Sequence, residues 1–580
     1  MADSMKKACC MLMTVLLAVA AKGATVVDGL KAQFRNGQVF MIWNDAPVPQ
    51  GGTFNVYAAS QPITASNLAT ATKIAHHVER QSARDWWRDP ASFKKGAPSA
   101  EPIGFVIEGG GAPLNPAGGL FVHTPTAENV GLQFYAVTCV SPDGTEEKEI
   151  VAGRNATAVA VEQSVASTEA IWIGAGKEPE SSATKGKSLR FNLHGRTGGG
   201  DSSANYQYLA FGGGKQGWRE GLPFKFKLSV SDEAVVITPS NCFWAGRPVL
   251  ESWDARDHVM AVENFWYGCN ANIYDAALMR TGNTVNYSEE ILLWMKDWAK
   301  RHLGIDEKRV YLQGGSMGGS GSIANAIQHA DAYAAVCAIV PVVSYTKPGK
   351  GSARRLETVC GPITDKAPLT NEGIPLLNRM NGEEVVRKAE VDLPFLFIIN
   401  GRKDASIPWE NNPGFYRALN ESRQGFVAFW NDGEHGTAEK LVPEDVKAWS
   451  GGGMLRCFAL NQSFPAFSNC STNKNPGSGD PGDGDIVGWM NRGLDWKDVE
   501  DAADHYAITI LADYPGIEYP VSVDVTPRRV QQFKPSAGQK LKVKLPNGVE
   551  REIVVDKHGL FTVAGVAIGS KDGVRMTVSK

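Results

Sequence analysis

YLQGGSMGGSGS, residues 311–322, places Ser316 in the middle of a glycine-rich bend. A strand-like run, RVYLQ, precedes the bend, and a helix-like run, GSGSIANAIQHA, follows it. Residues 314–318 match the pattern G-x-S-x-G, in which the glycines relieve the crowding of a sharp strand-to-helix turn. A larger side chain at 314 or 318 would clash there, and the serine takes strained backbone angles that expose its hydroxyl. The alternative is an ordinary glycine-rich loop.

The order of residues further along the chain favours a nucleophilic serine. A serine hydroxyl needs a base, and the base needs a third group to orient it. Asp404 directly follows the apolar run PFLFIIN, and His435 directly follows FVAFWND, which gives the order serine, acid, histidine. Each side chain therefore falls at the carboxyl end of a strand, where open α/β sheets bind ligands. Asp432 and Glu434 are alternative acids.

A hydrolytic serine also needs donors for the oxyanion of the tetrahedral intermediate. The backbone amide of Met317, the residue after the serine, is one candidate. The run LHGRTGGGD, residues 193–201, ends an early strand and offers the amide of Arg196 or Thr197 as the second donor. No GK[ST] follows these glycines, so a phosphate-binding loop is a poor interpretation.

Apolar strands alternate with helices across residues 166–470, which predicts an α/β domain with a mostly parallel sheet and helices on both faces. One helix is expected over residues 288–304, with Ser288 as N-cap and Gly304 after its last turn.

Residues 25–165 and 486–580 instead carry short runs of β-branched and aromatic residues bounded by turns. We expect a β-sandwich in each; the first resembles a fibronectin type III module. The Gly/Asp/Pro-rich stretch 471–485 is expected to be a linker. Its Asp480, Asp483 and Asp485 could hold calcium, although their spacing misses the EF-hand pattern.

The N-terminus is typical of a secretory signal, residues 1–24, because a short basic segment precedes an apolar run too short to span a bilayer. A buried first helix is the alternative. The formal net charge of -3 gives no reason to expect nucleic acid or a membrane surface as partner. Nine cysteines, two of them in the signal, permit a disulfide such as Cys457–Cys470, and no cysteine/histidine spacing suggests a metal site.

Residues 185–460 resemble the α/β-hydrolases of the esterase D, feruloyl esterase and polyhydroxyalkanoate-depolymerase-like group, relatives of the prolyl oligopeptidase clan. The motifs LHG, GGSMGG, GRKD and GEHG carry the resemblance. It implies a catalytic triad of Ser316, Asp404 and His435, acyl transfer through an acyl-enzyme, and no cofactor. The loop reads HGRTGGG where the family has HGGG, which leaves the second oxyanion donor open.

Aromatic residues near these motifs are candidates to bind substrate. Phe265, Trp266 and Tyr267 lie in one loop, and Trp409 follows the acid; such side chains stack on sugars or aryl acids, and they also fill cores. We therefore expect a secreted or periplasmic serine esterase acting on feruloyl or acetyl esters of plant polysaccharide. The alternatives are a prolyl oligopeptidase-like peptidase or polyester depolymerase, and a non-catalytic glycan-binding protein. The oligomeric state stays open.

Overall fold

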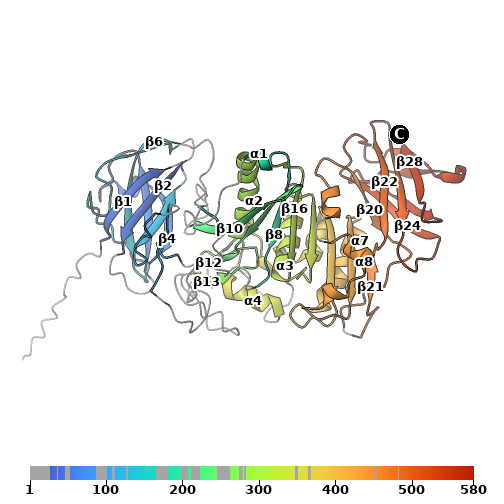
Figure 1. Cartoon of the computed structure of the whole chain (residues 1–580), viewed down its shortest axis with the longest axis horizontal. Helices are drawn as coiled ribbons and strands as arrows, with labels where there is room; N and C mark the ends of the chain where they lie inside the picture. The colour runs from blue at the N-terminus through green and yellow to red at the C-terminus, as the bar shows by residue number, and fades with distance from the viewer. Residues whose placement is uncertain are drawn as a thin grey trace, which may run out of the picture.

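The computed structural model covers the chain in three regions that lie side by side along the long axis of the molecule (Figure 1). The described residues are 26–35, 37–45, 52–85, 101–107, 111–123, 125, 129–164, 181–196, 207–210, 223–244, 261–273, 279, 282–345, 351–363, 368–450, 453–480 and 482–580. The expected signal segment therefore lies outside them. Among the described residues, no helix combines the length and the apolar character needed to cross a bilayer.

The N-terminal region is a sandwich of two antiparallel sheets. One sheet has the order β1-β2-β5 and the other the order β4-β3-β6-β7. The strands are β1 (Asp28–Arg35), β2 (Gln38–Asn44), β3 (Thr53–Ala59), β4 (Thr72–Glu79), β5 (Gly119–His123), β6 (Gly131–Val140) and β7 (Val161–Gln163), with the short 3-10 helix η1 (Leu68–Thr70). Val39, Phe54 and Tyr135 are fully buried in the shared core. The expected N-terminal β module is therefore present.

Nine described strands form the central sheet, in the order β21-β19-β18-β17-β16-β8-β11-β10-β9. Six consecutive strands, from β19 to β11, are parallel. At one end of the sheet β21 pairs antiparallel with β19, and at the other end β10 pairs antiparallel with β11 and β9 with β10. Their bounds are β8 (Ser188–Leu193), β9 (Gln207–Ala210), β10 (Pro223–Val230), β11 (Ala234–Pro239), β16 (Val310–Gly315), β17 (Ala335–Ile339), β18 (Phe395–Gly401), β19 (Phe426–Asn431) and β21 (Gly488–Met490). Strand β18 is buried throughout, as expected for a parallel strand covered on both faces.

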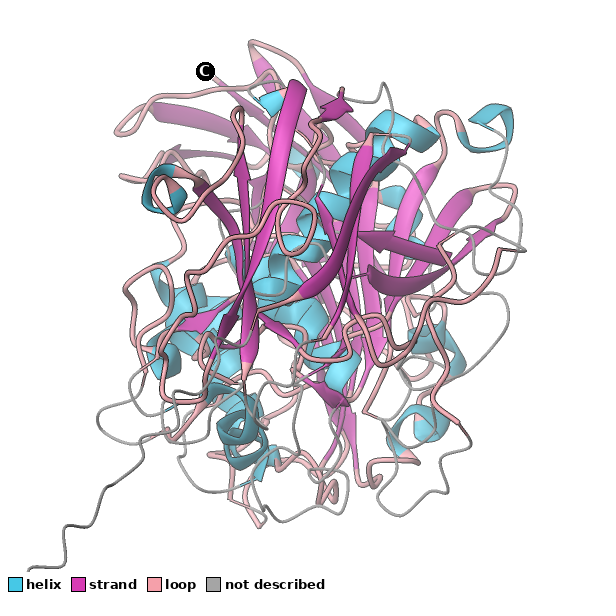
Figure 2. Ribbon diagram, turned by 90° about the vertical axis from the view of Figure 1, so that its left-hand side faces the viewer, coloured by secondary structure: helices cyan, strands magenta, loops and turns pink. Residues whose placement is uncertain are grey.

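Helices cover this sheet in the central region of the molecule (Figure 1), and Figure 2 shows them in cyan. They are α1 (Ser181–Thr184), α2 (Tyr287–Trp298) with the π-helical turn η7 (Ala299–Leu303), α3 (Met317–Gln328), α4 (Gly351–Cys360), α5 (Leu376–Arg379), α6 (Gly382–Lys388), α7 (Asn412–Glu421) and α8 (Glu444–Lys447), with the 3-10 turns η8 (Trp409–Asn411), η9 (Ala438–Leu441) and η10 (Met454–Cys457). Two small hairpins, β12 (Cys242–Trp244) with β13 (Ala261–Glu263) and β14 (Cys269–Asn270) with β15 (Thr284–Val285), complete the domain. The sheet and helices form the predicted α/β architecture.

The predicted helix over residues 288–304 is present as α2 and η7, and Gly304 ends it in the left-handed conformation at φ 63°. Its start differs from the prediction. Asn286 is the N-cap, and the Ser288 hydroxyl donates instead to Oδ1 of Asn264 at 2.8 Å. Ser288 is therefore used to hold a neighbouring loop rather than to cap its own helix.

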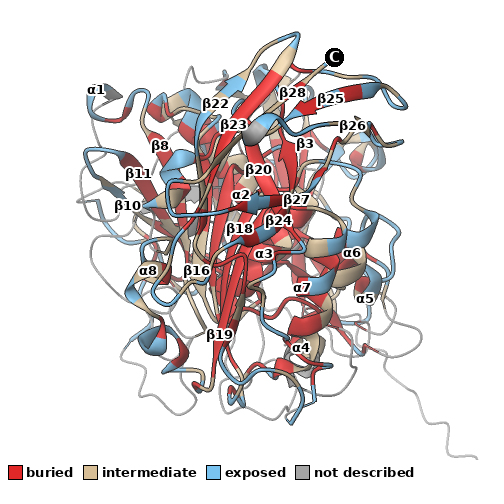
Figure 3. Ribbon diagram, turned by 90° about the vertical axis from the view of Figure 1, so that its right-hand side faces the viewer, coloured by how far each residue is buried: buried red, intermediate tan, exposed pale blue. Residues whose placement is uncertain are grey.

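The C-terminal region is a second sandwich. A three-stranded sheet, β20-β24-β27, packs on a five-stranded sheet, β22-β23-β28-β25-β26. The strands are β20 (Phe464–Ser468), β22 (Leu494–Asp501), β23 (His505–Ala512), β24 (Val521–Arg528), β25 (Lys540–Lys544), β26 (Glu550–Val554), β27 (Val563–Ile568) and β28 (Val574–Ser579), with the 3-10 turn η11 (Pro546–Gly548). Figure 3 shows the buried positions of the central and C-terminal strands in red, with the partly exposed helices α6 and α7 to one side of them.

The boundary between the central and C-terminal regions differs from the expected linker at 471–485. Strand β20, expected in the central domain, belongs to the C-terminal sheet, and β21, expected in the C-terminal domain, joins the central sheet beside β19. The chain thus passes back and forth between the two regions. A composition rich in Gly, Asp and Pro does not distinguish a linker from a tightly turned loop that returns to the sheet.

The candidate disulfide between Cys457 and Cys470 is not present. Cys457 is an exposed thiol and Cys470 a buried one, and no disulfide joins them. The two residues lie on different elements, since Cys457 ends η10 and Cys470 follows β20. Proximity in sequence was the only argument for this pair.

Arg529 fixes the C-terminal sandwich to the central domain. Its guanidinium donates to the backbone oxygens of Tyr333 and Ala334, each at 2.9 Å, and its own backbone amide donates to the carboxylate of Asp392 at 2.9 Å. The side chain is buried, and this burial lowers the pKa of Arg529 to about 10, so that it stays charged at neutral pH. A buried charge on backbone carbonyls is a strong anchor, because its loss removes one donor from each of these carbonyls.

We predict that Arg529→Met lowers the free energy of unfolding of the central and C-terminal regions by about 2 to 3 kcal/mol, because two buried carbonyls each lose a charged donor. Urea unfolding followed by tryptophan fluorescence measures the change. The matched control is Arg154→Met, which removes a half-exposed arginine of the N-terminal sandwich and should cost less than about 0.5 kcal/mol. Equal effects of the two substitutions would contradict the anchoring role.

Candidate active site

Ser316 lies on the sharp turn between β16 and α3, with backbone angles of φ 56° and ψ -122°. A positive φ is unfavourable for a residue with a Cβ and persists only where surrounding structure enforces it. A Cβ on Gly314 would lie 2.4 Å from the carbonyl carbon of Gly318, and one on Gly318 would lie 1.9 Å from the backbone oxygen of Leu193. The glycines are therefore required by close packing, as the sequence predicts.

The three residues predicted from chain order come together at the carboxyl end of the sheet. Nε2 of His435 lies 2.8 Å from Oγ of Ser316, and Nδ1 of the same ring lies 2.7 Å from Oδ2 of Asp404. Both contacts are within hydrogen-bond distance. With Nδ1–H donated to the carboxylate, Nε2 is left to accept the serine proton. The imidazole is one-third exposed, so a substrate can reach it.

Asp404 is held more tightly than an exposed loop carboxylate would be. It is 4% exposed, and its second oxygen accepts from the backbone amides of Ser406 and Ile407 at 2.8 and 2.9 Å. The alternative acids lie elsewhere: Asp432 pairs with Lys403 at the surface, and Glu434 is exposed. The carboxylate that contacts the imidazole is thus Asp404.

The loop that carries His435 is fixed by a buried amide. Asn431, the last residue of β19, accepts from the backbone amide of Gly433 at 2.9 Å and donates to the backbone oxygen of Ala438 at 2.8 Å. These two bonds close the turn on both sides of the histidine. The imidazole position is therefore set by backbone contacts of its own loop as well as by Asp404.

The candidate oxyanion donors surround the serine from two sides. Met317 is the first residue of α3, so its amide has no carbonyl partner within the helix and is available to an anion. Gly195 lies against the turn, because a Cβ there would be 3.6 Å from Cβ of Ser316. Arg196 follows it, with its side chain 3.6 Å from the carboxylate of Glu263. Thr197 lies outside the described residues.

His194 supports this oxyanion loop and was not singled out from sequence. Its Nδ1–H donates to the oxygen of Gly195 at 2.8 Å, and its Nε2 accepts the backbone amide of Asn241 at 2.9 Å. This pattern requires the neutral imidazole. Its backbone oxygen also accepts from the indole of Trp266 at 3.1 Å. The position of a histidine directly between a strand and the glycines is the signal that could have identified it.

The expectation that Phe265, Trp266 and Tyr267 bind substrate is wrong in placement. All three are buried, with exposed fractions of 5%, 2% and 0%. Trp266 packs directly on Gly321 of α3, where a Cβ would lie 2.3 Å from the tryptophan Cβ. These side chains therefore form core beneath the catalytic turn and do not line a cleft.

Trp409 is likewise buried and does not offer a face to substrate. Its indole donates to the oxygen of Pro476 at 3.2 Å, and the guanidinium of Arg402 lies 5.4 Å from its ring centroid. Arg402 also donates to the backbone oxygens of Asp483 at 2.7 Å and Asp485 at 2.8 Å. The loop expected to be a linker is thus folded onto the segment that carries the catalytic acid.

This arrangement bears on the calcium hypothesis for Asp480, Asp483 and Asp485. Their backbone oxygens face the Arg402 guanidinium, and their carboxylates accept hydrogen bonds from Ser478 and from the amide of Asn475. Within the described part of the chain, no group of three or more His, Cys, Asp or Glu side chains is placed to hold a metal ion. A guanidinium therefore supplies the positive charge around which this loop folds.

Comparison with known proteins is consistent with this geometry. Residues 274–441, which include all three triad residues, match the prolyl oligopeptidase family. No curated protein sequence matches the chain.

Three of the solved structures that resemble part of this chain are given with their identity, TM-score and coverage. An S-formylglutathione hydrolase from Agrobacterium tumefaciens is 15% identical (TM-score 0.29), with 54% of this chain and 86% of that chain covered. The fluorophosphonate-binding serine hydrolase FphF from Staphylococcus aureus is 16% identical (TM-score 0.27), with 43% of this chain and 78% of that chain covered. A putative dipeptidyl aminopeptidase IV from Bacteroides ovatus is 13% identical (TM-score 0.27), with 70% of this chain and 54% of that chain covered.

The pH dependence of stability should reveal the buried His194. Burial lowers the pKa of His194 from 6.5 to about 4. In the unfolded chain this histidine takes up a proton below about pH 6.5, while the folded protein does so only near pH 4. Its stabilising contribution is therefore complete above pH 6.5 and is lost as the pH falls toward 4, by about 3 kcal/mol in total.

We predict that His194→Gln makes unfolding free energy less dependent on pH between 6.5 and 4 than in the wild type, because the amide does not titrate. Denaturant unfolding at a series of pH values measures both slopes. The exposed His558→Gln serves as control and should keep the wild-type slope. A His194→Gln slope equal to that of the wild type would show that the imidazole is not buried in its neutral form.

Proposed function

We propose that this serine hydrolase of the α/β-hydrolase type is a secreted or periplasmic carboxylic ester hydrolase that acts on feruloyl or acetyl esters of plant polysaccharide. The observation that carries the proposal is the continuous hydrogen-bonded chain from Asp404 through His435 to Ser316, with the serine on a strained turn. A hydroxyl held this way is an activated nucleophile beside a fixed base. Acyl transfer is the reaction class that such a site performs.

The steps follow from the geometry. His435 Nε2 takes the Ser316 proton as Oγ attacks the ester carbonyl, and the resulting imidazolium is stabilised by the Asp404 carboxylate. The Met317 amide and the amide of Arg196 or Thr197 are the donors that we assign to the developing oxyanion. Collapse releases the alcohol, which leaves with the proton from His435. A water then adds to the acyl-enzyme by the same route and frees the acid.

The carbohydrate part of the proposal has separate support. Two β-sandwiches flank the catalytic domain, an arrangement that fits an enzyme working on a polymer. The sequence begins with a segment typical of secretion, outside the described residues.

A peptidase of the prolyl oligopeptidase type is the second candidate, and the family matched by residues 274–441 favours it. Relatives of that type usually carry a propeller domain, whereas the N-terminal region here is a two-sheet sandwich. A polyester depolymerase has the same triad and remains an alternative ester hydrolase. A non-catalytic glycan-binding protein is disfavoured by the intact hydrogen-bond chain.

We predict that the wild type hydrolyses p-nitrophenyl acetate and that Ser316→Ala lowers kcat/KM by at least about 10³-fold, because the nucleophile is lost. Ser570→Ala, which changes an exposed serine of the C-terminal sandwich, is the matched control and should retain wild-type activity. Equal rates for wild type and Ser316→Ala would favour the glycan-binding alternative.

A panel of methyl ferulate, acetylated xylan, a polyester film and a proline anilide then separates the enzyme classes. The proposal predicts turnover of the first two substrates above the others. Preferential cleavage of the anilide would assign the chain to the peptidase alternative, and preferential release from the film would assign it to the depolymerase alternative.

A further inference from the structure

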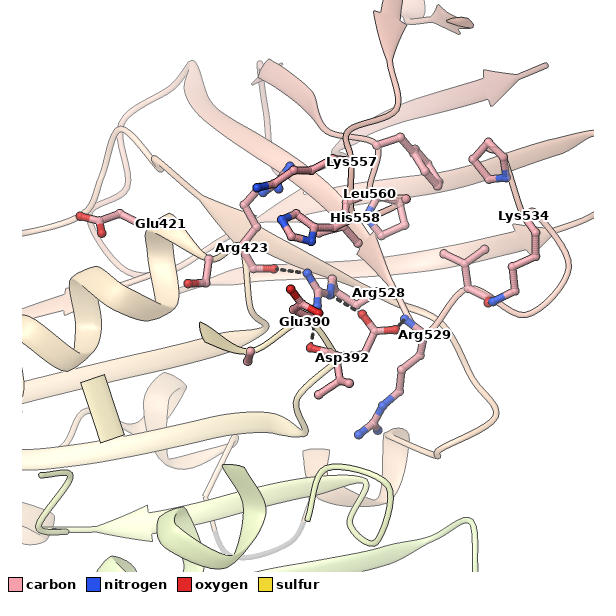
Figure 4. Close-up of a pocket in the computed structure, with 18 of the residues that line it drawn as sticks. Glu390, Asp392, Glu421, Arg423, Arg528, Arg529, Lys534, Lys557, His558 and Leu560 are labelled. Carbon is pink, nitrogen blue, oxygen red and sulfur yellow. Dashed lines mark hydrogen bonds and ion pairs between the residues drawn. The ribbon is translucent and has the colours of Figure 1, made fainter. Parts of the chain in front are cut away.

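A cleft of about 970 Å³ lies between the central domain and the C-terminal sandwich. Figure 4 shows the residues that line it. Its walls are the segments after α6 and α7 on one side and residues 527–535 and 557–561 on the other. None of the segments that hold Ser316, Asp404 or His435 contributes to it. The cleft is therefore a second concave surface, distinct from the catalytic site.

Positive charge predominates among the residues that line this cleft. Seven lysines and arginines face three carboxylates, those of Glu390, Asp392 and Glu421. Figure 4 shows Arg423, from the segment after α7, close to Arg528, Lys557 and His558 of the opposite wall. Concave surfaces of one sign concentrate ligands of the opposite sign.

Two of the three carboxylates are already used in ion pairs between neighbouring residues. Asp392 lies 2.5 Å from Nε of the buried Arg528, and Glu421 pairs with Arg387. Arg423 pairs with Asp556 at the base of the cleft. The Asp392–Arg528 and Arg423–Asp556 pairs join the two domains, whereas the Glu421–Arg387 pair lies within the central domain. Of the carboxylates that line the cleft, only the exposed Glu390 is left to balance the remaining cations.

On the central wall Lys388 pairs with Glu384 of α6, so the remaining cations lie on the C-terminal wall. Lys557 and His558 are exposed, and neither has an ion pair with any described residue. Lys534 contacts the backbone oxygen of Val530 and likewise has no carboxylate partner in the described part of the chain.

Apolar groups lie beside these charges. Val391 is 55% exposed on the wall formed by the central domain, and Leu560 is half-buried on the wall formed by the C-terminal sandwich. A sugar ring presents apolar C–H faces together with polar groups, and a uronate adds one carboxylate per residue. Cations with apolar patches between them match that chemistry better than they match a small inorganic anion.

We propose that this interdomain cleft binds a uronate-bearing oligosaccharide, with Lys557, His558 and Lys534 as donors to its carboxylates. The choice of a carbohydrate rests on the proposed function, while the requirement for an anion rests on the charges in the cleft. The site would hold an acidic polysaccharide beside the catalytic domain.

Calorimetric titration of the full-length Ser316→Ala chain tests the proposal, because this variant cannot turn over an ester. The probes are an oligogalacturonide and the same oligosaccharide with its carboxylates methyl-esterified. We expect the free acid to bind, the methyl ester to bind at least tenfold more weakly, and binding to weaken as salt rises.

A double variant, Lys557→Gln with His558→Gln, should lower affinity for the free acid about tenfold, since two exposed donors are lost. Lys542→Gln removes an exposed lysine from β25 of the same sandwich, outside the cleft, and should leave affinity unchanged. Circular dichroism of each variant checks that the fold is retained.

Three results would overturn the proposal: no binding of the free acid, equal binding of the methyl ester, or equal affinity of the double variant and the Lys542→Gln control. Displacement of the oligosaccharide by equimolar inorganic phosphate would likewise indicate an adventitious anion only. Ester hydrolysis is measured separately on the wild type. If the oligosaccharide binds but the wild type hydrolyses no ester, only the proposed function is refuted. If the wild type hydrolyses esters but the oligosaccharide does not bind, only the proposed role of the cleft is refuted.

Discussion

The crowded contact between β8, β16 and α3 is the constraint on which the site depends. Gly318 lies so close to the backbone oxygen of Leu193 that no other residue fits, and this forces the chain to turn within the five residues around Ser316. The serine is left at a positive φ with its hydroxyl above the sheet. The same contact places the end of β8, and with it the oxyanion loop, against the nucleophile. One packing requirement thus sets both the attacking oxygen and the groups that stabilise the oxyanion.

Polar contacts, rather than further apolar packing, hold the other parts of the site. Asp404 is fixed by backbone amides of its own loop, His435 by a turn that Asn431 closes, and the oxyanion loop by neutral His194. Arg402 and Arg529 use backbone carbonyls in the same way to attach the C-terminal part of the chain. Donors aimed at carbonyls are directional, so they fix loops that burial alone would leave free to shift. Catalytic geometry of this kind needs such support, because small displacements of the reacting groups are costly.

The sequence was sufficient to predict the parts of the molecule that follow from local pattern and chain order. The turn at Ser316, the two strand ends that carry Asp404 and His435, and the sandwich on each side all have short-range signals. The aromatic loop did not, because whether Trp266 faces solvent or core depends on Gly321, 55 residues later in sequence. The loop at 471–485 resembles a linker in sequence for a similar reason: its fold depends on a residue distant in the chain. This loop is ordered by the guanidinium of Arg402, which donates to backbone oxygens of the loop. The composition of the loop does not indicate that contact, because Arg402 lies about 70 residues earlier in the sequence.

The central claim is that His435 activates Ser316 and no other hydroxyl. Reaction of the native protein with a fluorophosphonate, followed by peptide mass spectrometry, tests it directly, since attack by the activated oxygen forms one P–O bond and releases fluoride. The account predicts a single phosphonyl group on Ser316 in the wild type and none in His435→Ala. Modification of a different residue, or undiminished modification of Ser316 without the imidazole, would contradict it.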